Sequence, residues 1–229
     1  MRILFLDSPY HGQRQYEKKV WIYPSHLAMY CTYLRNEGHD VTWLGTDDGS
    51  FDKIIESDLQ IPVDFEDLPI PDRVFTNAKN PKYLTYGNYK YFPGSHFMSS
   101  NLCWWAGAKG CVFCVDSKRI IEGEHRGVRT VDHVMSEIEN CVSLNFKELF
   151  DDAGTIPINS WLNELCHKMI KSSLNKKIVL GANLNPIKQD FKLMKEAGFR
   201  YILVGVESAN QETIDRIQIL ATNLERCGV

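Results

Sequence analysis

Runs of apolar residues predict two strands and a helix at the start of the chain. Arg2 to Leu6 and His39 to Leu44 are apolar stretches typical of buried strands. Between them, Pro24 to Asn36 carries apolar residues at helical spacing, and Gly38 follows where a left-handed C-cap is expected. This order of strand, helix and strand predicts parallel pairing, because parallel strands need a crossover connection. The start of the chain is therefore expected to be a short Rossmann-like βαβ segment.

The regular pattern is lost between Phe51 and Tyr91. Prolines interrupt this stretch repeatedly, and Leu68-Pro69-Ile70-Pro71 cannot continue a helix. We therefore predict three parts: an N-terminal segment over residues 1–65, a linker over 66–95 and a second unit over 96–229.

Strands and helices alternate again in the second half of the chain. The predicted strands are Phe146 to Phe150, Lys177 to Ala182 and Tyr201 to Val206, and the predicted helices are Thr130 to Leu144, Pro157 to Ser173, Pro186 to Ala197 and Gln211 to Leu224. Polar pairs, Asp151-Asp152 and Glu207-Ser208, end two of the strands. The carboxyl ends of strands carry the chemistry in parallel α/β folds, so both pairs are candidate site residues.

The composition sets limits on function. Among 229 residues, 26 Lys and Arg face 29 Asp and Glu, a net charge of -3 that gives no electrostatic footprint for nucleic acid. No apolar run approaches the roughly 20 residues needed to span a bilayer, and Met1 to Asp7 is too short for a signal peptide. We expect a cytoplasmic protein without membrane contact, in which the odd number of seven cysteines does not form a disulfide framework.

Three of these cysteines lie close together. Cys103 is followed by seven residues and then Cys111, and two residues separate Cys111 from Cys114. This spacing suits three corners of an iron–sulfur cluster whose fourth iron accepts another ligand. It suits a structural zinc site equally well, with His96 or His125 as the fourth ligand. Spacing alone leaves both alternatives open, and buried cysteines that bind no metal are a third, less favoured one, since cysteine packs well as a small hydrophobe.

Several motifs in order resemble the radical SAM proteins associated with cobalamin-binding domains. Gly110-Cys111-Val112-Phe113-Cys114 resembles their signature, in which the last two cysteines flank an aromatic residue. The other matching segments are Arg126 to Glu137, Phe150 to Asp152 with Ile158-Asn159 and Trp161-Leu162, Met194 to Gly198, Val204 to Ser208, and Glu212 to Ile214. The resemblance implies a partial (β/α) barrel of TIM type within an α/β fold.

The resemblance also implies cofactors and site residues. A 4Fe–4S cluster would be held by Cys103, Cys111 and Cys114, and S-adenosylmethionine (SAM) would bind its open iron and be cleaved to a deoxyadenosyl radical by one electron. Phe113 would pack near the adenine of SAM. Asp151 and Asp152 would contact its amino group, and Glu207 and Ser208 its ribose or amino group. The alternative for both polar pairs is to cap the helix that follows.

The chain departs from the family pattern at three points. Gly107 stands where the common motif has its first cysteine, so Cys103 must reach the cluster by a longer loop. The cobalamin signature Asp-x-His-x-x-Gly is absent, because Pro9 stands two residues after Asp7, and cobalamin is therefore unsupported. We count four barrel units, whose last strand leaves an open edge. Three explanations fit that edge. The chain is a fragment, another subunit covers the edge, or the protein has lost full activity.

The sequence thus predicts a radical SAM enzyme that needs a reductant and modifies an unknown substrate, by methyl transfer or rearrangement. Two alternatives remain open at this point. One is a non-enzymatic α/β binding module with structural zinc, and the other is a protein that keeps the cluster without turnover.

Overall fold

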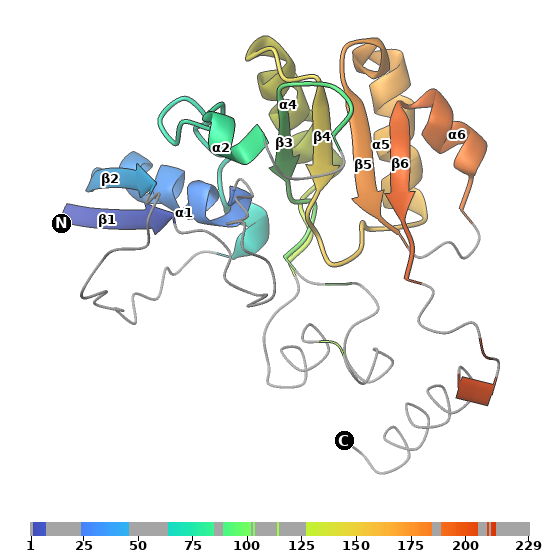
Figure 1. Ribbon diagram of the computed structural model, residues 1–229, viewed down its shortest axis with the longest axis horizontal. Coiled ribbons are helices and arrows are strands. Elements are labelled where there is room, and N and C mark those ends of the chain that lie inside the picture. Colours follow the sequence, from blue (N-terminus) through green and yellow to red (C-terminus); the bar gives the residue numbers. More distant parts are fainter. Residues whose placement is uncertain are drawn as a thin grey trace.

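A small parallel sheet forms the N-terminal part of the fold in the computed structural model. The structure describes residues 2–7, 24–45, 64–84, 89–101, 103, 114, 127–184, 189–205, 210 and 212–213. Strand β1 (Arg2–Asp7) pairs in parallel with β2 (Asp40–Gly45), and α1 (Ser25–Asn36) connects them (Figure 1). Gly38 has a φ of 82° just beyond α1, which is the left-handed C-cap that the sequence predicts.

A second parallel sheet of four strands follows, in the order β3-β4-β5-β6. Its strands are β3 (Gly94–Phe97), β4 (Glu148–Asp151), β5 (Val179–Asn183) and β6 (Phe199–Leu203). Helices α4 (Val131–Ser143), α5 (Ser160–Lys171) and α6 (Phe191–Glu196) make the crossovers and cover one face of the sheet (Figure 1). Sequential order with a helix between neighbours makes this an α/β fold consistent with a partial β/α barrel.

The boundaries differ from the predicted ones where the chain turns. β3 was not predicted as a strand, because a four-residue run beside Pro93 carries too little alternation to be recognised. β6 begins at Phe199, two residues before the predicted start. α5 begins at Ser160 rather than Pro157, because Asn159 adopts a φ of 59° that a helix cannot contain.

Short helical segments join the two sheets. They are the 3-10 turn η1 (Phe65–Asp67) and the helix α2 (Pro81–Leu84), and a second 3-10 turn, η2 (Leu174–Lys176), precedes β5. Phe65, Leu68 and Ala78 are buried. The residues between the sheets therefore pack against the rest of the described chain.

The main core lies between the four-stranded sheet and its helices. Phe97, Leu149 and Leu180 point to this face from three neighbouring strands and are fully buried. Helices α4 and α5 contribute the apolar residues that oppose them, among them Val134, Ile138, Leu162, Leu165 and Met169. Burying one such side chain contributes about 1.5–3 kcal/mol, so this layer fixes the strands that carry the candidate site.

A buried ionic network attaches the residues before β3 to the sheet and α4. Glu137 receives hydrogen bonds of 2.5 Å from Arg73 and from Arg129, and the side chains of all three are fully buried. Arg73 also donates to the carbonyl of His96 (2.8 Å) and Arg129 to that of Met98 (2.9 Å). Burial alone would raise the pKa of Glu137, but the two guanidinium groups outweigh it and hold that pKa below its ordinary value.

No helix within the described ranges is long and apolar enough to cross a membrane.

Candidate functional site

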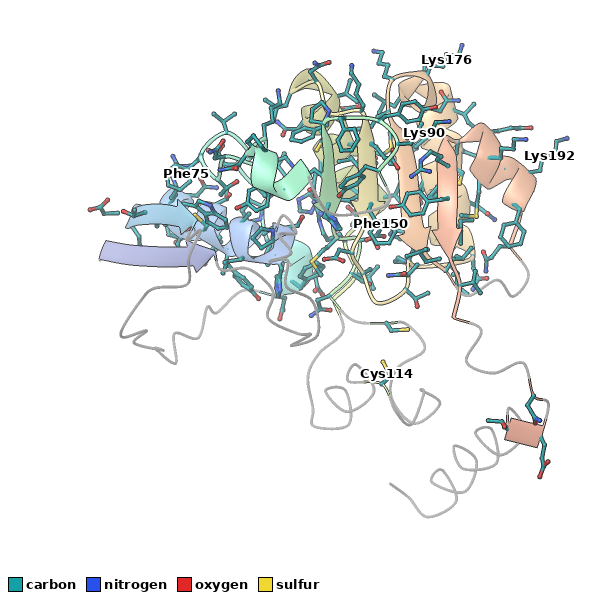
Figure 2. All side chains as sticks on the ribbon, viewed as in Figure 1. Phe75, Lys90, Cys114, Phe150, Lys176 and Lys192 are labelled. Carbon is teal, nitrogen blue, oxygen red and sulfur yellow. The ribbon has the colours of Figure 1, made fainter. Side chains whose placement is uncertain are left out.

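The face of the sheet opposite the helices carries one row of side chains across all four strands. Its members are His96, Phe150, Gly181 and Tyr201, which are partners in the parallel register. The rings of His96 and Phe150 meet edge to face at 5.6 Å, and those of Phe150 and Tyr201 stack at 5.5 Å. Phe150 lies in the middle of the sheet (Figure 2). We call this side of the sheet the inner face.

Glycines make room for the rings of the inner face. A Cβ atom on Gly181 would lie 2.4 Å from Cε1 of Tyr201, and one on Gly94 would lie 2.6 Å from Cγ of Tyr89. Both distances are shorter than real side chains tolerate, so the two tyrosine rings occupy the space that the glycines leave. Any residue other than glycine at either position would displace an aromatic ring.

Glu148 is a fully buried carboxylate near the start of β4. Its Oε2 accepts hydrogen bonds from the amides of Lys90 (2.8 Å) and Tyr91 (3.0 Å). Its Oε1 accepts from Nε (2.8 Å) and Nη2 of Arg200, whose guanidinium also lies over the Tyr201 ring. All of these partners satisfy the carboxylate, so Glu148 has a structural role at the amino ends of the strands.

The two aspartates at the end of β4 have different surroundings. Asp151 is fully buried and accepts hydrogen bonds from the amides of Ser99 (3.0 Å) and Ala153 (3.1 Å) and from the Ser99 hydroxyl. Burial raises the pKa of Asp151 to about 6, although these hydrogen bonds oppose the shift. The side chain of Asp152 is 45% exposed, and its Oδ1 lies 3.7 Å from Nδ1 of His96. Asp152 is therefore the aspartate that a ligand can reach.

Neither aspartate caps the following helix. The residue at the N-cap of α5 is Asn159, and it makes no side-chain capping bond. The capping alternative for Asp151-Asp152 is therefore wrong.

His96 presents an imidazole with unused hydrogen-bonding capacity. The residue is buried, and neither ring nitrogen has a hydrogen-bond partner in the described part of the chain. The Tyr89 hydroxyl is buried there in the same way, and its ring meets that of His96 edge to face at 5.7 Å. Burial, with Tyr201, Asp152 and Glu148 nearby, raises the pKa of Tyr89 so that it stays protonated. Buried polar atoms without partners are rare in native proteins, which makes this corner a candidate ligand contact.

The cysteines of the predicted cluster lie toward the carboxyl ends of the strands where the structure describes them. Cys103 and Cys114 are both half-buried. The Cys103 thiol donates to Oγ1 of Thr155, 3.2 Å away, in the turn that follows β4. Cys114 lies beyond the ends to which the strands of the four-stranded sheet point (Figure 2).

Several predicted site residues fall outside the described ranges, namely Cys111, Phe113, Glu207 and Ser208. Within the described ranges, no three His, Cys, Asp or Glu side chains come together as a metal site. The complete cysteine triad and the SAM contacts of Phe113, Glu207 and Ser208 therefore stay predictions.

The remaining described cysteines are poor ligands. Burial raises the pKa of the Cys31 thiol to about 11 and those of Cys141 and Cys166 to about 12. Iron and zinc bind the thiolate form, which burial disfavours at these three positions. Cys103 and Cys114 are only half-buried, so their thiols fit a metal cluster better.

Sequence reasoning overlooked two contributors to this region. It considered His96 only as a fourth zinc ligand, and it gave Thr155 no role. His96 precedes Cys103 closely and Thr155 follows Asp152 closely in the sequence, but no periodic pattern marks either. Only the pairing of β3 with β4 shows that they belong to one site.

Comparison with known proteins gives a partial likeness to a solved structure. No protein-family model and no curated protein matches the chain. Among solved structures, it is similar to TsrM, a radical S-adenosylmethionine methyltransferase from Kitasatospora setae solved with tryptophan substrate and the SAM analogue aza-SAM. The match has a TM-score of 0.45 and 17% identity, and it covers 52% of this chain and 23% of that one. A likeness this limited carries no argument about function.

Proposed function

We propose that the chain is a radical SAM enzyme whose 4Fe–4S cluster is held by Cys103, Cys111 and Cys114. The observation that supports this most directly is the place of Cys103. Its thiol contacts the turn after β4, at the carboxyl edge of a parallel β/α sheet, and that edge is where such folds place their chemistry.

The chain supplies groups suited to SAM at the same edge. The half-exposed carboxylate of Asp152 is the described group that suits an ammonium or sulfonium charge. Asp151 already accepts hydrogen bonds from Ser99 and Ala153, so its proposed role is to hold the turn that carries Asp152. Phe113, Glu207 and Ser208 are proposed further contacts, on sequence grounds alone.

When bound, the cluster supplies the electron that cleaves SAM reductively, and an external reductant must restore it. The residues of this chain bind and orient SAM, and the inner face with its rings at Tyr89, Phe150 and Tyr201 is where we place the substrate. Methyl transfer and rearrangement are the two reaction classes we propose for it.

Anaerobic purification with iron, sulfide and zinc analysis tests the proposal. We expect a brown protein with about four irons per chain that bleaches with dithionite. Cys103→Ala, Cys111→Ala and Cys114→Ala should each lose most of this iron. Cys166→Ala is the matched control, because it removes a buried thiol that we do not assign to the cluster, and it should keep the iron.

Two results would point to the alternatives. A colourless protein with one zinc per chain would replace the cluster by a structural metal site and contradict the proposal. A protein that holds iron but leaves SAM intact under reducing conditions would keep the cluster and contradict the enzymatic part.

A further inference from the structure

Thr155 occupies a defined place beside the cysteine that starts the predicted cluster motif. Its hydroxyl oxygen accepts a hydrogen bond from the Cys103 thiol (3.2 Å), and its O–H donates one to the carbonyl oxygen of Gly154 (2.8 Å). The two residues are far apart in the sequence, so the contact depends on the pairing of β3 with β4. Nothing in the cysteine motif itself indicates this partner.

The turn that carries Thr155 is held from the strands on both sides. Toward β3, Asp151 binds Ser99, and the amide of Asp152 donates to the carbonyl of Phe97 (2.8 Å). Toward β5, the side chain of Asn183 donates to the carbonyl of Ala153 (3.3 Å), and the amide of Ile156 donates to the Asn183 carbonyl (2.9 Å). These bonds fix the Thr155 hydroxyl relative to the carboxyl edge of the sheet.

We propose that Thr155 is a positioning residue for the Cys103 sulfur, and that its hydroxyl donates to that sulfur when Cys103 ligates the cluster. This inference rests on the proposed function. A hydroxyl has one donor and two acceptor sites. The O–H of Thr155 now donates to the Gly154 carbonyl, so it must rotate from that carbonyl to the sulfur to become a donor to a metal-bound thiolate. Hydrogen bonds to ligating groups orient the ligand and stabilise the metal site.

Iron release tests the positioning role without any turnover. Thr155→Val keeps the shape of the side chain and removes the hydroxyl, whereas Thr155→Ser keeps the hydroxyl. Under anaerobic conditions we expect a chelator to remove iron about 10-fold faster from Thr155→Val than from the natural chain, since outer partners of metal ligands typically contribute 10–100-fold to affinity. Thr155→Ser should restore the slow release. Equal release from all three proteins, with equal melting temperatures, would overturn the proposal.

A cysteine at the same position tests the contact in metal-free protein. In Thr155→Cys, two thiols would stand where sulfur and oxygen now lie 3.2 Å apart. Oxidised glutathione should convert the two thiols to a disulfide and be released as two molecules of reduced glutathione. Peptide mapping detects the disulfide between the two positions. Ser172→Cys, exposed in the turn after α5, is the control and should not pair with Cys103.

The two measurements separate the possible failures. A disulfide without any iron binding in the natural chain would contradict the proposed function and, with it, the role of Thr155 at a cluster. Iron binding without the disulfide would leave the proposed function intact and show that Thr155 does not contact Cys103.

Discussion

Oδ1 of Asp152 lies 3.7 Å from Nδ1 of His96, and this pair joins the ends of two neighbouring strands on the inner face. The adjacent Asp151 points to the helix side of the sheet and is saturated by Ser99 and Ala153. Successive residues of a strand face opposite sides, which is why two aspartates next to each other have separate roles. Asp152 is the one available to a ligand, and Asp151 is the one that maintains the local structure.

The first prediction concerns Asp152. Asp152→Asn should leave the melting temperature within about 2 °C of the natural value, because substitutions at exposed positions rarely change stability by more than ~0.5 kcal/mol. It should weaken SAM binding about 10-fold or more, since a charge-assisted hydrogen bond contributes ~1.5–3 kcal/mol. Equilibrium dialysis with the reconstituted protein measures this. Glu139→Gln, an exposed change on α4, is the control, and an equal loss there would contradict a specific role.

His96 gives a second prediction with two opposite effects. His96→Phe keeps an aromatic ring between Tyr89 and Phe150 and removes two buried nitrogens without described partners. Because unsatisfied buried polar atoms cost about 1–3 kcal/mol each, the free protein should be as stable as the natural chain or more stable in urea unfolding. If the imidazole contacts the ligand, SAM or substrate binding should weaken in the same variant. Lower stability with unchanged binding would contradict the interpretation of His96 as a ligand contact.

The sequence was most informative where a pattern is repeated. The strand and helix periodicity from Thr130 onward predicts α4, β4, α5 and β5 within a few residues, because each buries one apolar face. It did not reveal β3, which is short, or the partners of Glu137. The pairing of Arg73 with Glu137 spans 64 positions and leaves no local signature, since a buried charge in a sequence looks like a surface charge.

The candidate site, like the fold, could be predicted from the sequence only in part. Its residue types were visible in the sequence, as cysteines near one another and as acids at a strand end. Their orientation was not, because which of Asp151 and Asp152 faces the inner side depends on the register with β3. Contacts such as Cys103 with Thr155 require the tertiary fold.

A third prediction follows from the pKa of Asp151, which burial raises to about 6 from 3.8. Between these values the folded protein retains a proton that the unfolded chain has lost, so stability falls as pH rises from about 4 to 6. The total effect is on the order of 3 kcal/mol, taking 1.36 kcal/mol for each pKa unit. Asp151→Asn cannot titrate and should flatten this part of the profile in urea unfolding from pH 4 to 7. An unchanged slope would show that Asp151 is not the group responsible.

The buried ionic network gives a fourth prediction. Glu137→Gln removes the charge between two buried guanidinium groups and should cost about 3–5 kcal/mol, as breaking buried ion pairs does. Asp132 lies on the same helix, α4, and Asp132→Asn breaks its exposed pair with Lys168 of α5. It should cost far less than Glu137→Gln, because exposed pairs contribute little. Similar losses in the two variants would contradict the structural role of Glu137.

The last prediction concerns Gly181 and Tyr201, which are register partners on β5 and β6. Gly181→Ala places a methyl group where the Tyr201 ring lies, at 2.4 Å from its Cε1, and β5 is paired with a strand on each side. The ring must move and lose its stacking on Phe150, so we expect a destabilisation of about 1–3 kcal/mol, as for other overpacked positions. Tyr201→Ala also destabilises by removing the ring. In the double variant the added methyl has no ring to meet, so Gly181→Ala should then cost close to nothing. A double-mutant cycle in urea measures this coupling, and additive losses would show that the ring does not occupy the space above Gly181.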